Sequence, residues 1–291
     1  MDMDTDESPD DQQSDKDSEF SFSPSGEFLD SNGKHFEFAY YSSNTKNQKR
    51  YEKIGNAVTE HIYKVMESKF DLMRIDIPGT ESEESLDQDF GTSFVFMSKN
   101  FQHRQGKKLI LINGSGAVRA GQWARKIIVN DNLHAGSMLP YIEWALQNEF
   151  GILVLNTNES GPNLKGSETP FEHAETAWNK FLSHVSEKSV FIVAHSFGGI
   201  VTQKIASKYE KFDKVVAKIA FTDSVHMGPL HCNNIPIINW ITSDAAVNNY
   251  LGEKNGCELR SAGTQEHAWT SHCAINHIFD WFLETGLIKS E

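Results

Sequence analysis

Ala194-His195-Ser196-Phe197-Gly198-Gly199 is the stretch that decides the fold of this 291-residue chain. It directly follows the apolar run 190–193 and precedes a segment, 199–209, with helical character. A serine between a strand and a helix needs small residues two positions before and two after it, because the two elements nearly touch there. Ala194 and Gly198 meet that need, although glycine is usual at the first position. The stretch therefore predicts a sharp turn that lifts the Ser196 hydroxyl above the edge of a sheet.

Apolar runs rich in β-branched residues recur on both sides of this turn. They lie at 109–112, 152–155, 190–193 and 215–221, with a less pure run at 237–241. Uninterrupted apolar runs are typical of strands covered on both faces. Helical segments are expected between and after them, at 139–147, 172–185, 199–209 and 273–285. This alternation predicts an α/β class with a doubly wound, mainly parallel sheet, and the serine turn makes it α/β-hydrolase-like.

The N-terminal part adds smaller elements to this sheet. Asn32-Gly33 between two mixed apolar runs predicts a hairpin, and apolar residues at helical spacing predict a helix over 51–65. Strands are expected at 71–77 and 94–97. Residues 1–26 include an acidic stretch that cannot bury enough surface to order itself. We therefore expect a disordered tail over 1–26 and one α/β-hydrolase-like domain over 27–291.

Charge narrows the classes of function. The first twenty residues contain nine acids against one lysine, −8 of the net charge of −13, and the remainder is mildly acidic. Because nucleic-acid binding depends on cations that contact phosphates, no direct nucleic-acid binding is expected. One basic segment runs against this trend and is either a solvated loop or an RNA-facing patch. It comprises Lys99, His103, Arg104, Lys107 and Lys108.

Targeting features are few. An acidic start replaces the basic and apolar regions of a secretory signal, and no apolar stretch approaches the length of a membrane span. The cysteines, Cys232, Cys257 and Cys273, have no framework spacing. A reducing compartment, cytosol or nucleus, is expected. No spacing typical of a metal or cofactor site occurs, so neither is expected.

A serine nucleophile needs hydrogen-bond donors for the oxyanion. The amide of Phe197, at the start of the following helix, is one candidate. The loop Asn113-Gly114-Ser115-Gly116 follows the strand 109–112 and could supply a second amide, from Gly114 or Ser115. A dinucleotide site does not fit this loop, because Arg119 occupies the position of the third glycine.

The base and the acid must follow the serine in the chain. His267, in a loop before the last helix, is the candidate base, and His272 is its rival. His195 adjoins the serine and is expected to be structural. Asp244, after the run 237–241, is the preferred acid, and Asp223 is the alternative. Either acid could instead be an ordinary loop cap.

The segment from Asn113-Gly114-Ser115-Gly116 to Trp123-Ala124-Arg125 resembles the Arb2 domain family, in particular the animal cotranscriptional regulators related to the fission-yeast Argonaute-binding protein. The similarity covers about residues 27–285. Further matches are Asn32-Gly33, Leu155-Asn156, the stretch 194–199, Phe221 to His226, Asn239-Trp240, Ser261-Ala262-Gly263, His267 and Thr270-Ser271. Two positions depart from the family's pattern, and both are asparagines. Asn113 stands where the family tends to have histidine, and the family is expected to have an acid near the position of Asn248, which would leave this chain without it if that acid belonged to the triad.

The resemblance implies an α/β-hydrolase-like fold with a serine in the nucleophile position. It also implies association with an Argonaute-family protein and with chromatin or splicing factors, in the nucleus and cytoplasm, in small-RNA silencing or splicing control. Two functions follow. One is a serine hydrolase that uses Ser196, His267 and Asp244 or Asp223 on a small ester or amide. The other is a scaffold that keeps Ser196 for the geometry of the turn.

Overall fold

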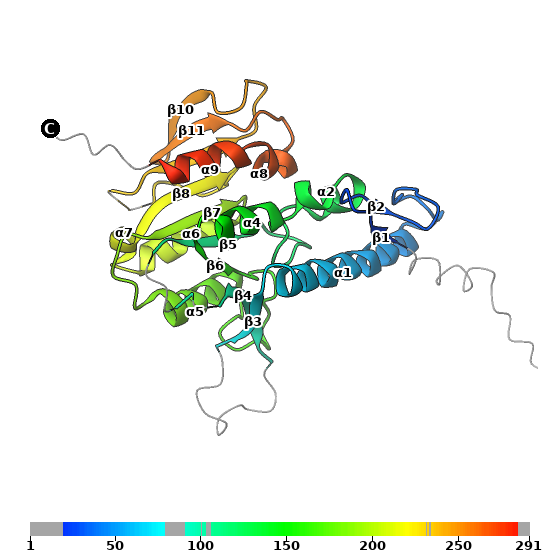
Figure 1. Cartoon of the computed structure of the whole chain (residues 1–291), viewed down its shortest axis with the longest axis horizontal. Coiled ribbons are helices and arrows are strands. Elements are labelled where there is room, and N and C mark those ends of the chain that lie inside the picture. The colour runs from blue at the N-terminus through cyan, green and yellow to red at the C-terminus, as the bar shows by residue number, and fades with distance from the viewer. Residues whose placement is uncertain are drawn as a thin grey trace, which may run out of the picture.

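The computed structural model describes residues 20–78, 91–99, 101–102, 106–230, 232 and 234–284. Their central feature is a nine-stranded sheet in the order β10-β11-β9-β8-β7-β5-β6-β4-β3 (Figure 1). The strands are β3 Leu72–Ile77, β4 Ser93–Ser98, β5 Lys108–Ile112, β6 Gly151–Val154, β7 Val190–His195, β8 Val216–Thr222, β9 Ile237–Ile241, β10 Tyr250–Lys254 and β11 Cys257–Ser261.

The middle of the sheet is parallel and its edges are antiparallel. Parallel pairs join β6 to β5, β5 to β7, β7 to β8, β8 to β9 and β9 to β11. Antiparallel pairs join β3 to β4, β4 to β6 and β10 to β11. Buried parallel strands need apolar side chains on both faces, which is why the predicted runs formed the centre. The predicted α/β-hydrolase-like fold is confirmed.

Helices cover both faces of the sheet. One layer contains α1 (Asn44–Ser68), α4 (Leu139–Gln147) and α9 (Ile275–Leu283), and the other contains α5 (Pro170–Leu182) and α6 (Gly198–Lys208). Figure 1 shows α4 and α9 on the side of the sheet opposite to α5 and α6. Side chains alternate along each strand: Leu109 and Leu111 pack in the first layer, and Ile110 and Ile112 in the second. Shorter helices are α2 (Arg125–Asn130), α3 (Leu133–Gly136), α7 (Phe212–Val215) and α8 (Thr270–Cys273).

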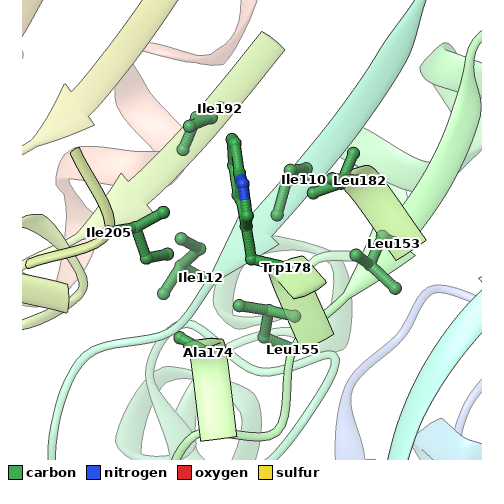
Figure 2. A pocket seen from close by; sticks show the side chains of 9 residues that line it. All are labelled: Ile110, Ile112, Leu153, Leu155, Ala174, Trp178, Leu182, Ile192 and Ile205. Atoms are coloured by element: carbon green, nitrogen blue, oxygen red, sulfur yellow. The ribbon is translucent and has the colours of Figure 1, made fainter. Parts of the chain in front are cut away.

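Trp178 of α5 fills the second layer. Figure 2 shows its indole among strand residues and Ile205 of α6. The void left beside it is about 10 Å³ and is lined only by apolar residues. A void of this size without polar partners does not hold an ordered water. This cavity is therefore part of the core packing and offers nothing to a ligand.

The N-terminal segment differs in detail from the prediction. Gly33 adopts φ +76° in a turn, but its flanks share only the bridge between Leu29 and His35. Instead, β2 (Phe28–Leu29) pairs with β1 (Ser21–Phe22), where Phe20 stacks on Phe28. The strand β1 lies within the last residues of the expected tail, whose first nineteen residues lie outside the described ones. The long helix begins at Asn44 because the Ser43 side chain caps it.

Two other predictions bear on function. In the basic segment, Lys99 pairs with Asp71 at 2.5 Å and Lys108 is buried in β5, whereas His103 and Arg104 lie outside the described residues. Within the ranges given above, no helix is both long and apolar enough to cross a bilayer.

Candidate active site

Ser196 lies on a strained turn between β7 and α6. Its φ is +51°, a conformation that non-glycine residues rarely adopt, and its amide donates to the Thr222 carbonyl at 3.1 Å. The helix passes close to β5: a Cβ atom on Gly198 would lie 2.8 Å from the Ile112 carbonyl oxygen. A Cβ atom on Gly199 would collide with the Ser224 side chain. These two glycines permit the turn that the sequence predicts, with the serine at its apex.

His267 and Asp223 form a hydrogen-bonded pair. His267 opens a short 3₁₀ helix, His267–Trp269, that follows β11, and Asp223 follows β8. The Nδ1 atom of His267 donates to Oδ2 of Asp223 at 2.6 Å. Burial tends to raise the pKa of Asp223, but hydrogen bonds from His267 and from the Thr242 amide outweigh it, and its pKa lies below the ordinary value. With Nδ1 engaged, Nε2 is the atom left to accept a proton.

Asp244, the acid preferred from the sequence, does not take this position. Its side chain is exposed in the loop after β9 and, among the described residues, makes no hydrogen bond or ion pair. The loop after β9 is instead tied toward β11, because the Ser243 amide donates to the Thr264 carbonyl at 2.8 Å. The chain after β8 turns at Asp223, whose φ is +51°, and this brings its carboxylate to His267. Asp223 therefore replaces Asp244 as the candidate acid.

Asn248, near which an acid is expected by resemblance, lies outside this cluster. Its Oδ1 atom accepts hydrogen bonds from Trp240 at 3.2 Å and from Arg260 at 3.1 Å. It stabilises the loop between β9 and β10. The asparagine at this position therefore does not remove a contact from His267.

Ser196 and His267 line one open cavity of about 260 Å³. In the described structure no hydrogen bond joins their side chains, a looseness that is common in the absence of substrate. Neither the amide of Phe197 nor those of Gly114 and Ser115 donates to another described protein group. Gly114 packs on the turn, since a Cβ atom there would lie 3.2 Å from Cβ of Ser196. The predicted oxyanion loop thus lies beside the predicted nucleophile.

Buried polar groups hold that loop in place. Asn158 donates to the carbonyls of Gly114 at 2.8 Å and Val118 at 3.0 Å, and the Ala120 amide donates to Asn156 at 2.9 Å. The Asn156 amide in turn donates to Nε2 of His173 at 3.0 Å. Burial lowers the pKa of His173 to about 3, so its ring stays neutral and can accept this bond. The loop is therefore rigid before any ligand binds.

The other two histidines considered from the sequence have structural surroundings. The His195 ring contacts that of His267 in a tilted arrangement with ring centroids 4.7 Å apart, and its Nδ1 atom donates to the Thr222 carbonyl at 2.9 Å. Burial lowers the pKa of His195 to about 4, so the ring is neutral. His272 contacts Trp269 and lies in α8, outside the residues that line the cavity. Neither ring pairs with a carboxylate of the residues that the structure describes.

The cavity is also lined by residues that the sequence did not single out as site residues. Among them are Tyr51 from α1, Trp123 and Arg125. Trp123 and Arg125 lie at the end of the segment 113–125, whose resemblance to the Arb2 domain family is highly specific. That resemblance is the sequence signal that could have marked them as site residues. In the part of the chain that the structure describes, no group of three potential metal ligands comes together.

Comparison with known proteins gives a consistent picture. A family model described as the Arb2 domain matches residues 28–161 and 158–252. A FAM172 family protein homologue of Caenorhabditis elegans is 40% identical, with 84% of this chain and 80% of that protein covered. The cotranscriptional regulator ARB2A of Mus musculus is 31% identical, with 84% and 73% covered, and that of Homo sapiens is 30% identical with the same coverage.

Solved structures that resemble the chain are distant in sequence. An esterase of Pyrococcus furiosus is 10% identical, with 74% of this chain and 91% of that chain covered and a TM-score of 0.44. A thermostable carboxylesterase from a metagenomic library is 14% identical, with 64% and 57% covered and a TM-score of 0.34. The assignment of the fold rests on the strand order of the sheet itself.

Proposed function

The chain belongs to the Arb2 domain family, and from this we propose that it is a cotranscriptional regulator whose Ser196–His267–Asp223 site works as a serine hydrolase on a small ester. One observation carries the chemical half of this proposal. The strained serine and a histidine already paired to a carboxylate line the same cavity. A serine retained only for the turn would not need that pair.

The chemistry follows from the positions of the atoms. Oγ of Ser196 attacks the ester carbonyl while Nε2 of His267 takes its proton, and Asp223 stabilises the imidazolium that forms. The amides of Phe197 and of Gly114 or Ser115 stabilise the oxyanion. His267 then protonates the departing alcohol. Water, activated by the same ring, cleaves the acyl-serine and restores the hydroxyl.

Labelling with a fluorophosphonate probe tests this half. We expect the wild type to be labelled and Ser196→Ala to be unlabelled. Ser207→Ala, an exposed serine on α6, is the matched control and should label like the wild type. A wild type that resists the probe, or a Ser196→Ala protein that still reacts, would remove the hydrolase proposal.

The cellular half of the proposal derives from the family. The mouse and human relatives carry the name cotranscriptional regulator, and we propose a nuclear role for this chain in control of transcription-coupled splicing or small-RNA silencing. An Argonaute-family protein and chromatin or splicing factors are the proposed partners, with a cytoplasmic fraction where Argonaute is cytoplasmic. Co-precipitation of an Argonaute from nuclear and cytoplasmic extracts at mild salt is the test, and repeated failure in both would contradict it.

A scaffold without chemistry is the second candidate function. The observation that favours it is the lack of a hydrogen bond between Ser196 and His267 in the described structure. A scaffold keeps its partners in Ser196→Ala, and its wild type is inert toward the probe. The two experiments together therefore separate a working enzyme, a scaffold and a protein with both roles.

A further inference from the structure

Arg125 is a buried cation in the wall of the cavity that holds Ser196 and His267. It is the first residue of α2, and its exposed fraction is 7%. Its Nε atom is buried without a hydrogen bond, and no described residue accepts a hydrogen bond from or forms an ion pair with its guanidinium. Burial lowers the pKa of Arg125, although the group stays charged at any physiological pH.

The described lining of the cavity holds no direct counter-ion for this charge. The described residues that line it include no aspartate or glutamate, and the other cationic side chain is the exposed Lys126. Arg119, in the same loop, shows the usual arrangement, since its Nε atom pairs with Glu159 at 2.9 Å. A buried ion without a counter-ion is strongly unfavourable. The exposed Glu52 carboxylate of α1 favours the charged form of Arg125, but no ion pair joins the two among the described residues. An anion that enters the open cavity would supply the direct partner that the described residues do not.

The neighbouring helix α1 leaves space for the side chain of Arg125. Gly55 faces the guanidinium, and a Cβ atom there would collide with Nη1 of Arg125. Gly55 is an interior position of α1, where glycine weakens a helix relative to alanine. Glycine at position 55 thus weakens α1 but leaves space for the buried guanidinium of Arg125 in the cavity that holds Ser196.

We propose that Arg125 binds a carboxylate on the substrate, so that the site takes small hemiesters of dicarboxylic acids. This inference rests on the proposed hydrolase function. The planar guanidinium fork matches a carboxylate through two parallel hydrogen bonds. A cavity of about 260 Å³ admits a small substrate. The ester carbonyl lies at Ser196 while the distal carboxylate pairs with Arg125. Hydrolysis releases the alcohol, and the dicarboxylate product keeps its distal carboxylate at Arg125.

Binding is measured on the Ser196→Ala protein, which lacks the nucleophile, by calorimetry with monomethyl adipate and with uncharged methyl hexanoate. We expect the anionic ester to bind at least about tenfold more tightly, because hydrogen bonds between a guanidinium and a carboxylate are stronger than those between neutral groups; tenfold corresponds to about 1.4 kcal/mol. The added Arg125→Met substitution should abolish that preference. Lys204→Met, an exposed lysine on α6, should keep it. The affinity for inorganic phosphate is measured in the same way, to test whether the site prefers a free anion. Tighter binding of phosphate than of the adipate ester overturns the carboxylate assignment.

Thermal unfolding without added anion separates a binding role from a structural one. If Arg125 serves a ligand, Arg125→Met removes an uncompensated charge and leaves the Tm unchanged or higher. If Arg125 is a structural member of the fold, the Tm falls by several degrees, and that result overturns the proposal. Equal affinity for the two esters in the Ser196→Ala protein also overturns it. Because these measurements need no turnover, a protein that binds the anion but resists the fluorophosphonate refutes only the hydrolase function.

Discussion

Replacing Asp223 with asparagine should nearly abolish the activity of Ser196. Asparagine has the same shape and tolerates the φ of +51° found at this position, so the loop after β8 should keep its path. The amide, however, can donate to Nδ1 of His267 at the 2.6 Å contact where the carboxylate now accepts. The ring proton then moves to Nε2, and the ring can no longer take the serine proton.

The size of the effect follows from exposure. In a fully enclosed triad, the corresponding change lowers kcat about 10⁴-fold. Here the His267 side chain is 48% exposed and that of Asp223 is 20% exposed, so water partly stabilises the imidazolium. We expect a loss of about 10³-fold, which is about 4 kcal/mol of transition-state stabilisation.

The assay is kcat/KM for 4-nitrophenyl butanoate, together with the rate of fluorophosphonate labelling. Asp244→Asn is the matched control and should stay within about twofold of the wild type, because Asp244 is exposed and does not contact His267. The reasoning is refuted if Asp223→Asn keeps a tenth or more of the wild-type rate. It is also refuted if Asp244→Asn causes an equal loss.

Gly198→Ala should lower the free energy of unfolding by about 1–3 kcal/mol, because its Cβ atom would approach the Ile112 carbonyl oxygen to 2.8 Å and force the backbone apart; urea unfolding with an unchanged midpoint would contradict this. Stability should also fall as the pH drops from about 6.5 toward 4. Burial lowers the pKa of His195 to about 4 and that of His173 to about 3, so the unfolded chain binds more protons in this window and acid favours unfolding. His173→Gln should reduce that slope, and a urea midpoint independent of pH between 7 and 4.5 would be the contrary result.

The acid is the part of the candidate site where the observed geometry favours the alternative from the sequence, Asp223, over the preferred Asp244. Asp223 and Asp244 follow adjacent strands, β8 and β9, and both positions suit a triad acid. The choice depends on where each loop goes after its strand. Tertiary hydrogen bonds decide that: the Asp223 amide donates to the Trp240 carbonyl at 2.8 Å, while the loop after β9 is held by the Thr264 carbonyl.

The hairpin of β10 and β11 is a second feature that the sequence did not predict. Most of its residues are exposed or only half-buried and include Gly252, so no apolar run or alternation marks the strands. The turn signal was present, since Asn255 and Gly256 both adopt positive φ as a two-residue hairpin turn requires. The strand β11 forms because its partner β9 offers a parallel edge, which is a long-range contact.

The central strands, the helices between them and the turn at Ser196 were determined by the sequence itself, because each depends on local requirements: apolar runs for buried strands and small residues where β7 meets α6. The pairing of His267 with Asp223 and the burial of Arg125 against Gly55 were decided only by the tertiary structure. Each of these joins segments far apart in the chain, and the burial of a charge depends on what packs over it, which no local pattern records.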